Sequence, residues 1–305
     1  MRSITIFLST LLLLFCSADC FLQTSTARFM LWHPSARSAS MGGVGTAIPT
    51  DGFAVFYNPA GLAFCEKVSL VGSYVKPFPF LARTTHSLIA LVIPIKPVGT
   101  IGISANLFWK DSQLQTSPNS PDPIGEDLPV SKFFFTTHWE IKLTYAALLA
   151  KNTSVGLNLS YLKINLSNTG AGSETRLMAG RTSTFLFGAG LLWNKLLPFT
   201  TWKPDFGQSA PFVGKYADNG ESAGFSVGLA LANSGTKITY VDFRQSDSPP
   251  TKLSLGLAYW PFYTPLLSML MSVDFEKEVF EPSLLDYIHL GTESRFAGIF
   301  ALRAG

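Results

Sequence analysis

The chain has 305 residues, of which 47% are hydrophobic and only 14% are charged, and its formal net charge is +3. A soluble domain usually carries about a quarter charged residues, so an ordinary soluble domain is disfavoured. No basic run is present, which argues against nucleic acid as a partner. Cys65 is the one cysteine beyond residue 20, so the sequence excludes a disulfide scaffold.

Residues 1–20 have the plan of a secretory signal peptide. Arg2 supplies a positive start, residues 4–15 form an apolar run, and the small or permissive residues Ala18 and Cys20 follow. The run is shorter than the ~20 residues that a transmembrane helix needs. We therefore expect export, with cleavage after Ala18 or after Cys20.

The rest of the chain alternates between apolar side chains and polar or small ones. In residues 138–145, for example, Glu140 and Lys142 share one face with His138, while Trp139 and Ile141 lie on the other. Such alternation is typical of strands, and it recurs often enough to predict about twelve of them. The predicted strands are 67–75, 86–95, 99–109, 136–149, 153–165, 182–194, 222–232, 236–243, 251–260, 267–275, 285–293 and 296–303.

The composition of the two strand faces indicates a membrane barrel. The second face carries mainly Gly, Ser, Ala and Asn, where a soluble sandwich would carry many charged residues. Transmembrane barrels direct apolar residues towards lipid and polar or small ones towards the lumen. We therefore predict an all-β fold, a transmembrane antiparallel β-barrel of about 12–14 strands in the bacterial outer membrane. The alternative is a secreted soluble β-sandwich. Aromatic residues near strand ends are the candidates for interfacial girdles: Tyr74, Trp109, Tyr161, Trp193, Tyr259 and Trp260.

A Gly-rich motif precedes the first predicted strand. Met41-Gly42-Gly43 is followed by Asp51 and then by Asn58-Pro59-Ala60-Gly61-Leu62. The glycines permit backbone conformations closed to other residues, and Asn58 before proline indicates a turn. This segment resembles the N-terminal signature of the FadL-type hydrophobic-compound transporters and of the PorV and PorQ group of the type IX secretion system. Residues 224–260 and 301–305 also resemble the PorV group.

The resemblance implies that residues 21–65 form a hatch inside a barrel made of residues 66–305. The implied gate residues are Gly42, Gly43, Asp51, Asn58, Pro59, Ala60 and Gly61. The FadL-like interpretation implies passive transport of long-chain fatty acids or other hydrophobic compounds, with membrane lipid and a hydrophobic small molecule as partners. The PorV-like interpretation implies instead a shuttle or scaffold that binds an exported protein. In both groups further strands follow one like 301–305, so we expect either closure by pairing of 296–303 with 67–75 or a C-terminally truncated barrel.

No pattern in the sequence indicates an enzyme. The four histidines are scattered without metal-ligand spacing, and no Gly-x-Ser-x-Gly elbow is present. We expect neither a catalytic residue, nor a metal, nor a cofactor. His138, Glu140 and Lys142 are interpreted as lumenal packing residues, since polar groups commonly fill barrel interiors.

Overall fold

A computed structural model describes residues 27–48, 51–77, 84–114, 133–166, 181–197, 224–239, 246–263, 266–281 and 287–305. The predicted signal peptide lies outside these residues, as do most of the predicted loops. The strands are β1 (Ser69–Val75), β2 (Thr84–Ile95), β3 (Gly99–Leu114), β4 (Phe133–Ala150), β5 (Thr153–Asn165), β6 (Arg181–Leu197), β7 (Gly224–Gly235), β8 (Ile238–Thr239), β9 (Ser246–Asp247), β10 (Lys252–Tyr263), β11 (Leu267–Glu278), β12 (Tyr287–Phe296) and β13 (Phe300–Ala304).

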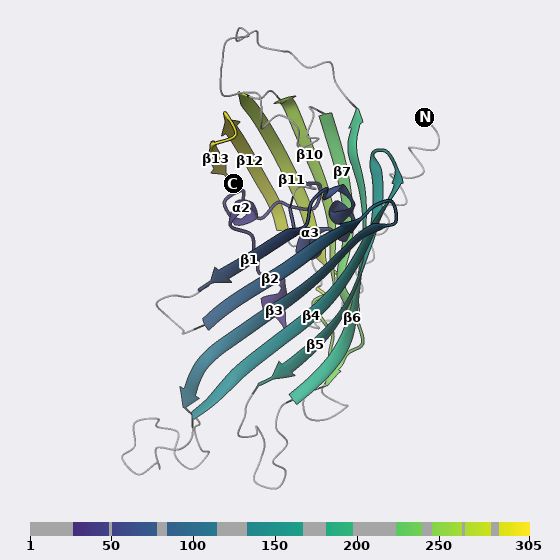
Figure 1. Ribbon diagram of the computed structural model, residues 1–305. Helices are drawn as coiled ribbons and strands as arrows, with labels where there is room; N and C mark the ends of the chain where they lie inside the picture. Colours follow the sequence, from purple (N-terminus) through teal and green to yellow (C-terminus); the bar gives the residue numbers. More distant parts are fainter. Residues whose placement is uncertain are drawn as a thin grey trace.

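Eleven strands of the described chain form one antiparallel sheet, in the order β1-β2-β3-β4-β5-β6-β7-β10-β11-β12-β13. The predicted antiparallel all-β fold is confirmed. The sheet curves around the N-terminal part of the chain, and β1 and β13 form its two edges (Figure 1). Each of these edge strands has one neighbour within the described residues, β2 and β12 respectively.

The predicted strand 236–243 is wrong as a member of this sheet. In the described part of that range only β8 forms, and it pairs with β9 in a separate two-stranded sheet. β7 instead pairs directly with β10, with Ala232 opposite Lys252. Asn233 has a left-handed backbone, φ 56°, which bends the chain near the end of β7. Residues 240–243 lie outside the described residues.

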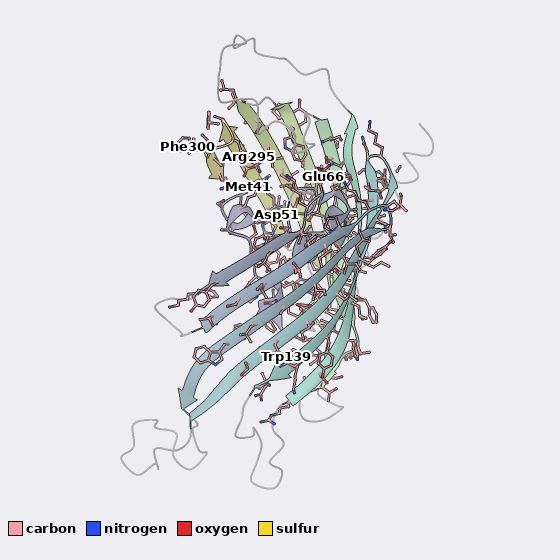
Figure 2. The ribbon with its side chains drawn as sticks, in the orientation of Figure 1. Met41, Asp51, Glu66, Trp139, Arg295 and Phe300 are labelled. Atoms are coloured by element: carbon pink, nitrogen blue, oxygen red, sulfur yellow. The ribbon has the colours of Figure 1, made fainter. Side chains whose placement is uncertain are left out.

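The two faces of the sheet differ as the alternation predicts. On β4, Ile141 and Leu143 are 52% and 51% exposed on the outer face, whereas Glu140 and Lys142 are 3% and 7% exposed on the inner one. Trp139 lies on this outer face (Figure 2). Large apolar side chains are exposed on other strands as well, among them Leu70, Ile89, Ile103, Leu157, Phe187 and Leu290.

One predicted girdle residue faces the other way. Tyr259 is exposed, but its neighbour Trp260 is buried, because successive strand residues point to opposite faces. Trp260 packs in a cluster with Leu270 of the sheet and Met41 of the N-terminal part of the chain. It is therefore an interior residue.

The inner face holds the N-terminal segment, which we define as residues 27–48 and 51–65. Its helices are short: η1 (Arg28–Leu31), α2 (Ala36–Ala39), α3 (Ala54–Tyr57) and η2 (Pro59–Phe64). No helix in the described part of the chain is long and apolar enough to cross a membrane. Figure 1 shows α2 and α3 inside the curve of the sheet.

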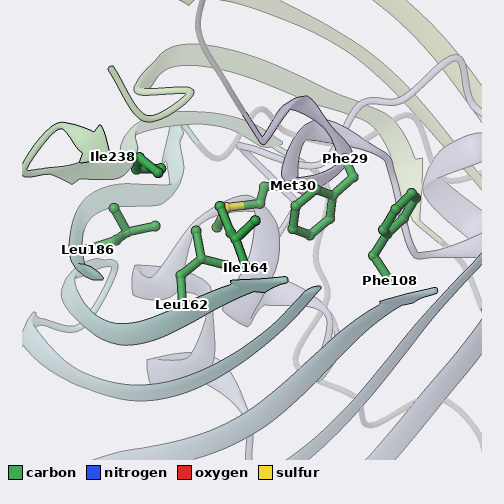
Figure 3. Close-up of a cluster of buried hydrophobic side chains, with 7 residues drawn as sticks. All are labelled: Phe29, Met30, Phe108, Leu162, Ile164, Leu186 and Ile238. Atoms are coloured by element: carbon green, nitrogen blue, oxygen red, sulfur yellow. The ribbon is translucent and has the colours of Figure 1, made fainter. Parts of the chain in front are cut away.

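The hydrophobic core lies between this segment and the inner face of the sheet, which we call the wall. All three buried clusters combine residues of both parts. Figure 3 shows one, in which Phe29 and Met30 lie near apolar side chains of β3, β5, β6 and β8. The wall members of this cluster are Phe108, Leu162, Ile164 and Leu186, and Ile238 of β8 joins them from the separate two-stranded sheet.

Candidate functional site: the N-terminal segment and its wall

Glycines of the wall make room for the segment. A methyl carbon added to Gly156 of β5 would lie 2.3 Å from the backbone carbon of Pro59, and one added to Gly190 of β6 would lie 2.0 Å from Oδ1 of Asn58. Four more wall glycines have such close neighbours in the segment: Gly102, Gly228, Gly256 and Gly291. The small residues of the inner face therefore admit the backbone of the segment at close range.

Asn58, a predicted gate residue, connects two parts of the segment to the wall. Its Nδ2 donates to the carbonyl of Thr46 at 2.8 Å and to that of Leu191 in β6 at 3.1 Å. Its Oδ1 accepts from the backbone N–H of Ala60 at 3.1 Å, which caps η2. The contacts with Thr46 and Ala60 are buried and the contact with Leu191 is partly buried, so loss of the amide would remove hydrogen-bond partners from these backbone groups.

The other residues of that motif are also inside. Pro59, Ala60 and Gly61 are buried in the first turns of η2, and Oγ of Ser154 in β5 donates to the carbonyl of Ala60 at 2.8 Å. Asp51 lies before α3, where its Oδ1 accepts from the backbone N–H of Phe53 at 2.9 Å. Asp51 thus supports a local turn.

Gly42 and Gly43 have left-handed backbones, with φ of 68° and 99°. A methyl carbon on Gly42 would lie 2.5 Å from the carbonyl oxygen of Leu290 in β12. One on Gly43 would lie 2.8 Å from Nδ1 of His289 and 2.9 Å from Nε2 of His33. Both the turn and the close approach to β12 therefore require glycine here.

A buried carboxylate on β11 fixes the next turn of the segment. Oδ2 of Asp274 accepts from the backbone N–H groups of Gly45 and Thr46, each at 2.8 Å. Asp274 is fully buried. Two charge-assisted hydrogen bonds at this depth hold the Gly-rich turn firmly on the wall.

Two arginines of the segment form ion pairs with the same side of the sheet. Arg37 of α2 makes a two-pronged contact with Glu293 of β12, at 2.8 and 3.0 Å. Arg28 of η1 reaches Glu278 at the end of β11 at 2.7 Å and Glu281 at 3.0 Å. The first half of the segment is thus linked by charges to β11, to β12 and to Glu281 just after β11. The cluster around α3 and η2 includes apolar side chains of β1, β2 and β4.

His138, Glu140 and Lys142 are buried on the inner face of β4. Nζ of Lys142 is 3.3 Å from Oε1 of Glu140 along the same strand. The ring of His138 stacks on Phe29 of the segment and on Phe108 of β3, with centroids 4.9 and 5.2 Å apart. His138 therefore contacts the segment directly, and the charged pair lies along the wall beside it.

The fold also brings together residues that the sequence leaves far apart. His33 of the segment, Glu276 of β11 and His289 of β12 each place one nitrogen or oxygen within 4.8 Å of the others. Lys252 of β10 donates to Oε1 of Glu276 at 2.7 Å. Burial, together with the nearby Lys252 ammonium, lowers the pKa of His33 to about 4, so its imidazole is neutral at neutral pH.

The sequence analysis did not identify the acidic residues of β11 that contact the segment, although their spacing in the sequence indicated them. Asp274, Glu276 and Glu278 recur at every second position of β11, in a chain with few charges. That spacing places all three on the inner face. Considered in the sequence together with the basic residues Arg28 and Arg37, these three acidic residues could have suggested a charged contact between the segment and the wall.

No protein-family model matches the sequence, and no curated protein matches it. Three solved structures resemble the chain at low identity. The toluene transporter TbuX of Ralstonia pickettii is 12% identical with a TM-score of 0.45, over 89% of this chain and 84% of that one. The toluene transporter TodX of Pseudomonas putida is 13% identical with a TM-score of 0.38, over 86% and 88%. A FadL homologue of Pseudomonas aeruginosa is 14% identical with a TM-score of 0.34, over 93% and 88%.

Proposed function

We propose that the chain is a bacterial outer-membrane barrel that carries long-chain fatty acids or other hydrophobic compounds, with the N-terminal segment as its hatch. The observation that carries the proposal is the distribution of side chains between the two faces of the sheet, which is the reverse of that in a soluble protein. Its outer face exposes large apolar side chains, whereas its inner face buries charged and polar ones. Water disfavours such a broad apolar surface, and lipid favours it.

Strand length fits the same environment. A tilted transmembrane strand needs about 9–11 residues, and β4 has 18.

The signal peptide expected in residues 1–20 provides the route of export, and its cleavage belongs to the proposal. Detergent-phase partitioning with heat-modifiable gel migration is the expected behaviour, and recovery as a soluble monomer without detergent would contradict it.

The hatch role rests on how the segment is attached. It fills the space inside the curved sheet, but its links to β11 and β12 are a few ion pairs and hydrogen bonds at Arg28, Arg37 and Asp274. Such discrete links can open without disrupting the strands themselves. The resemblance of residues 41–62 to the FadL-type signature supplies the class of cargo.

Uptake of a hydrophobic fluorescent probe by cells that carry the barrel tests the proposal. Asn58→Ala removes the side chain that joins the segment to β6, so we expect faster uptake than in the parent protein. Asn152→Ala is the matched control, because Asn152 is an exposed turn residue whose side chain donates to the carbonyl of Lys195 at 3.2 Å, away from the segment. Unchanged uptake in Asn58→Ala, with an intact barrel, would argue against a gate and favour the protein-binding scaffold instead.

A further inference from the structure

We propose that His33, Glu276 and His289 bind a divalent transition-metal ion that fastens the N-terminal segment to the wall. The three candidate ligand atoms lie within 4.8 Å of one another. Histidine nitrogens and carboxylate oxygens coordinate zinc at about 2.0–2.2 Å, so small side-chain rotations bring all three onto one ion. Two histidines with one glutamate form a ligand set that zinc uses in proteins.

Neighbouring groups orient two of these ligands. Nδ1 of His289 lies 2.5 Å from the carbonyl oxygen of Gly42, and since a carbonyl only accepts, Nδ1 carries the proton. This leaves the lone pair on Nε2, which lies 3.4 Å from Oε2 of Glu276. Lys252 holds the other oxygen of Glu276. Metal-binding histidines are typically oriented by a backbone carbonyl in this way.

Each histidine of the cluster has one buried nitrogen without a hydrogen-bond partner in the described part of the chain. Nδ1 of His33 and Nε2 of His289 are buried and have no hydrogen-bond partner among the described groups. Buried polar atoms of this kind require an explanation, such as an ion. A protonated His289 paired with Glu276 would account for the second nitrogen but not for the first.

The surroundings allow an ion to enter and limit how tightly it binds. The side chain of His289 is 15% exposed, and Gly43 has no side chain to separate the two imidazoles. The ammonium of Lys252 repels any cation held by Glu276. Removal of that charge should therefore strengthen metal binding.

Titration of the mature, metal-free protein in detergent tests the site. We expect one equivalent of Zn²⁺ by calorimetry and one equivalent of Co²⁺ with ligand-field absorption. His33→Ala and His289→Ala should each weaken binding by at least the roughly 10–100-fold that loss of a supporting residue causes. Lys252→Met should tighten it. Lys151→Met is the matched control for Lys252→Met, because Lys151 is an exposed turn residue outside the cluster and its loss should leave the affinity unchanged.

The wild-type titration keeps the proposal falsifiable even if a variant fails to fold. Absence of zinc binding by the wild-type protein would overturn the site and leave the His289–Glu276 ion pair as the explanation. Binding that survives in both folded alanine variants would overturn it as well. Because no transport is measured, these outcomes are independent of the proposed hatch function.

Discussion

Glycines on the two faces of the sheet differ sharply in what an added side chain would meet: Gly156 lies on the wall, and Gly72 lies on the exposed outer face. At Gly156 the nearest atoms are backbone atoms of Pro59 and Ala60, at 2.3 and 2.4 Å, and these cannot swing away. At Gly72 of β1 the nearest atom is 3.7 Å away. Backbone contacts of the kind at Gly156 therefore make a glycine necessary where the N-terminal segment meets the wall.

Gly156→Ala should therefore destabilise the folded barrel by about 1–3 kcal/mol, because it overpacks the contact with η2. Gly72→Ala should be neutral or slightly stabilising, since alanine restricts the unfolded chain. The temperature at which gel migration shifts would measure both. Equal shifts for the two variants would show that the segment does not sit against β5 as described.

Cys65 allows a second test at this scale. Burial, with Asp51 nearby, raises the pKa of its thiol from 9.0 to about 11. Only the thiolate reacts, and a rise of about two units lowers its fraction roughly a hundredfold near neutral pH. We expect slow maleimide labelling of the folded mature protein and fast labelling in denaturant, measured by mass spectrometry. Similar rates in both states would contradict a buried thiol.

Single residues show where sequence reasoning succeeds. Asn58 and Gly42 were identified from a local motif, and both are required by local geometry: a cap in one case and a left-handed turn in the other. Asp274 and His289 were missed because their partners lie more than 200 residues away along the chain. Local patterns do not encode such pairings.

Strands were predictable because alternation reports directly on the two faces of an element. The failure at 236–243 has the same origin, since alternation does not tell which strand a segment pairs with. There β10 is the strand that pairs with β7, after the left-handed residue Asn233 near the end of β7. The register and the pairing partners of a strand depend on all strands of the sheet, so the alternation within one strand does not predict them.

The outer face of β4 provides the test at the scale of elements. Leu143→Arg, at the centre of the exposed apolar band, should cost roughly 2–4 kcal/mol in a bilayer. Leu149→Arg, near the strand end, should cost about 0–1 kcal/mol because it reaches the interface. Unfolding by denaturant in lipid vesicles measures both. An equal loss of unfolding free energy in the two variants would show that the positions of Leu143 and Leu149 across the bilayer are assigned wrongly.

At the scale of the whole molecule, the two sheet edges make a prediction about the bilayer. Unpaired backbone groups in lipid cost several kcal/mol each, so we expect β1 and β13 to pair with each other. Cysteines at Val71 and at Ala301 or Leu302, in a Cys65→Ser background, should cross-link in membranes. The pair Val71 and Leu157, on strands separated by three others, is the control. Cross-linking no higher than in the control would rule out this closure.

The short helices of the N-terminal segment also determine the order in which the segment and the strands acquire their structure. Helices of four to six residues are unstable alone, since nucleation is costly and few hydrogen bonds follow. The contacts that hold them come from β2 to β12, which are synthesised later. The N-terminal segment can therefore complete its structure only once these later strands are available to it.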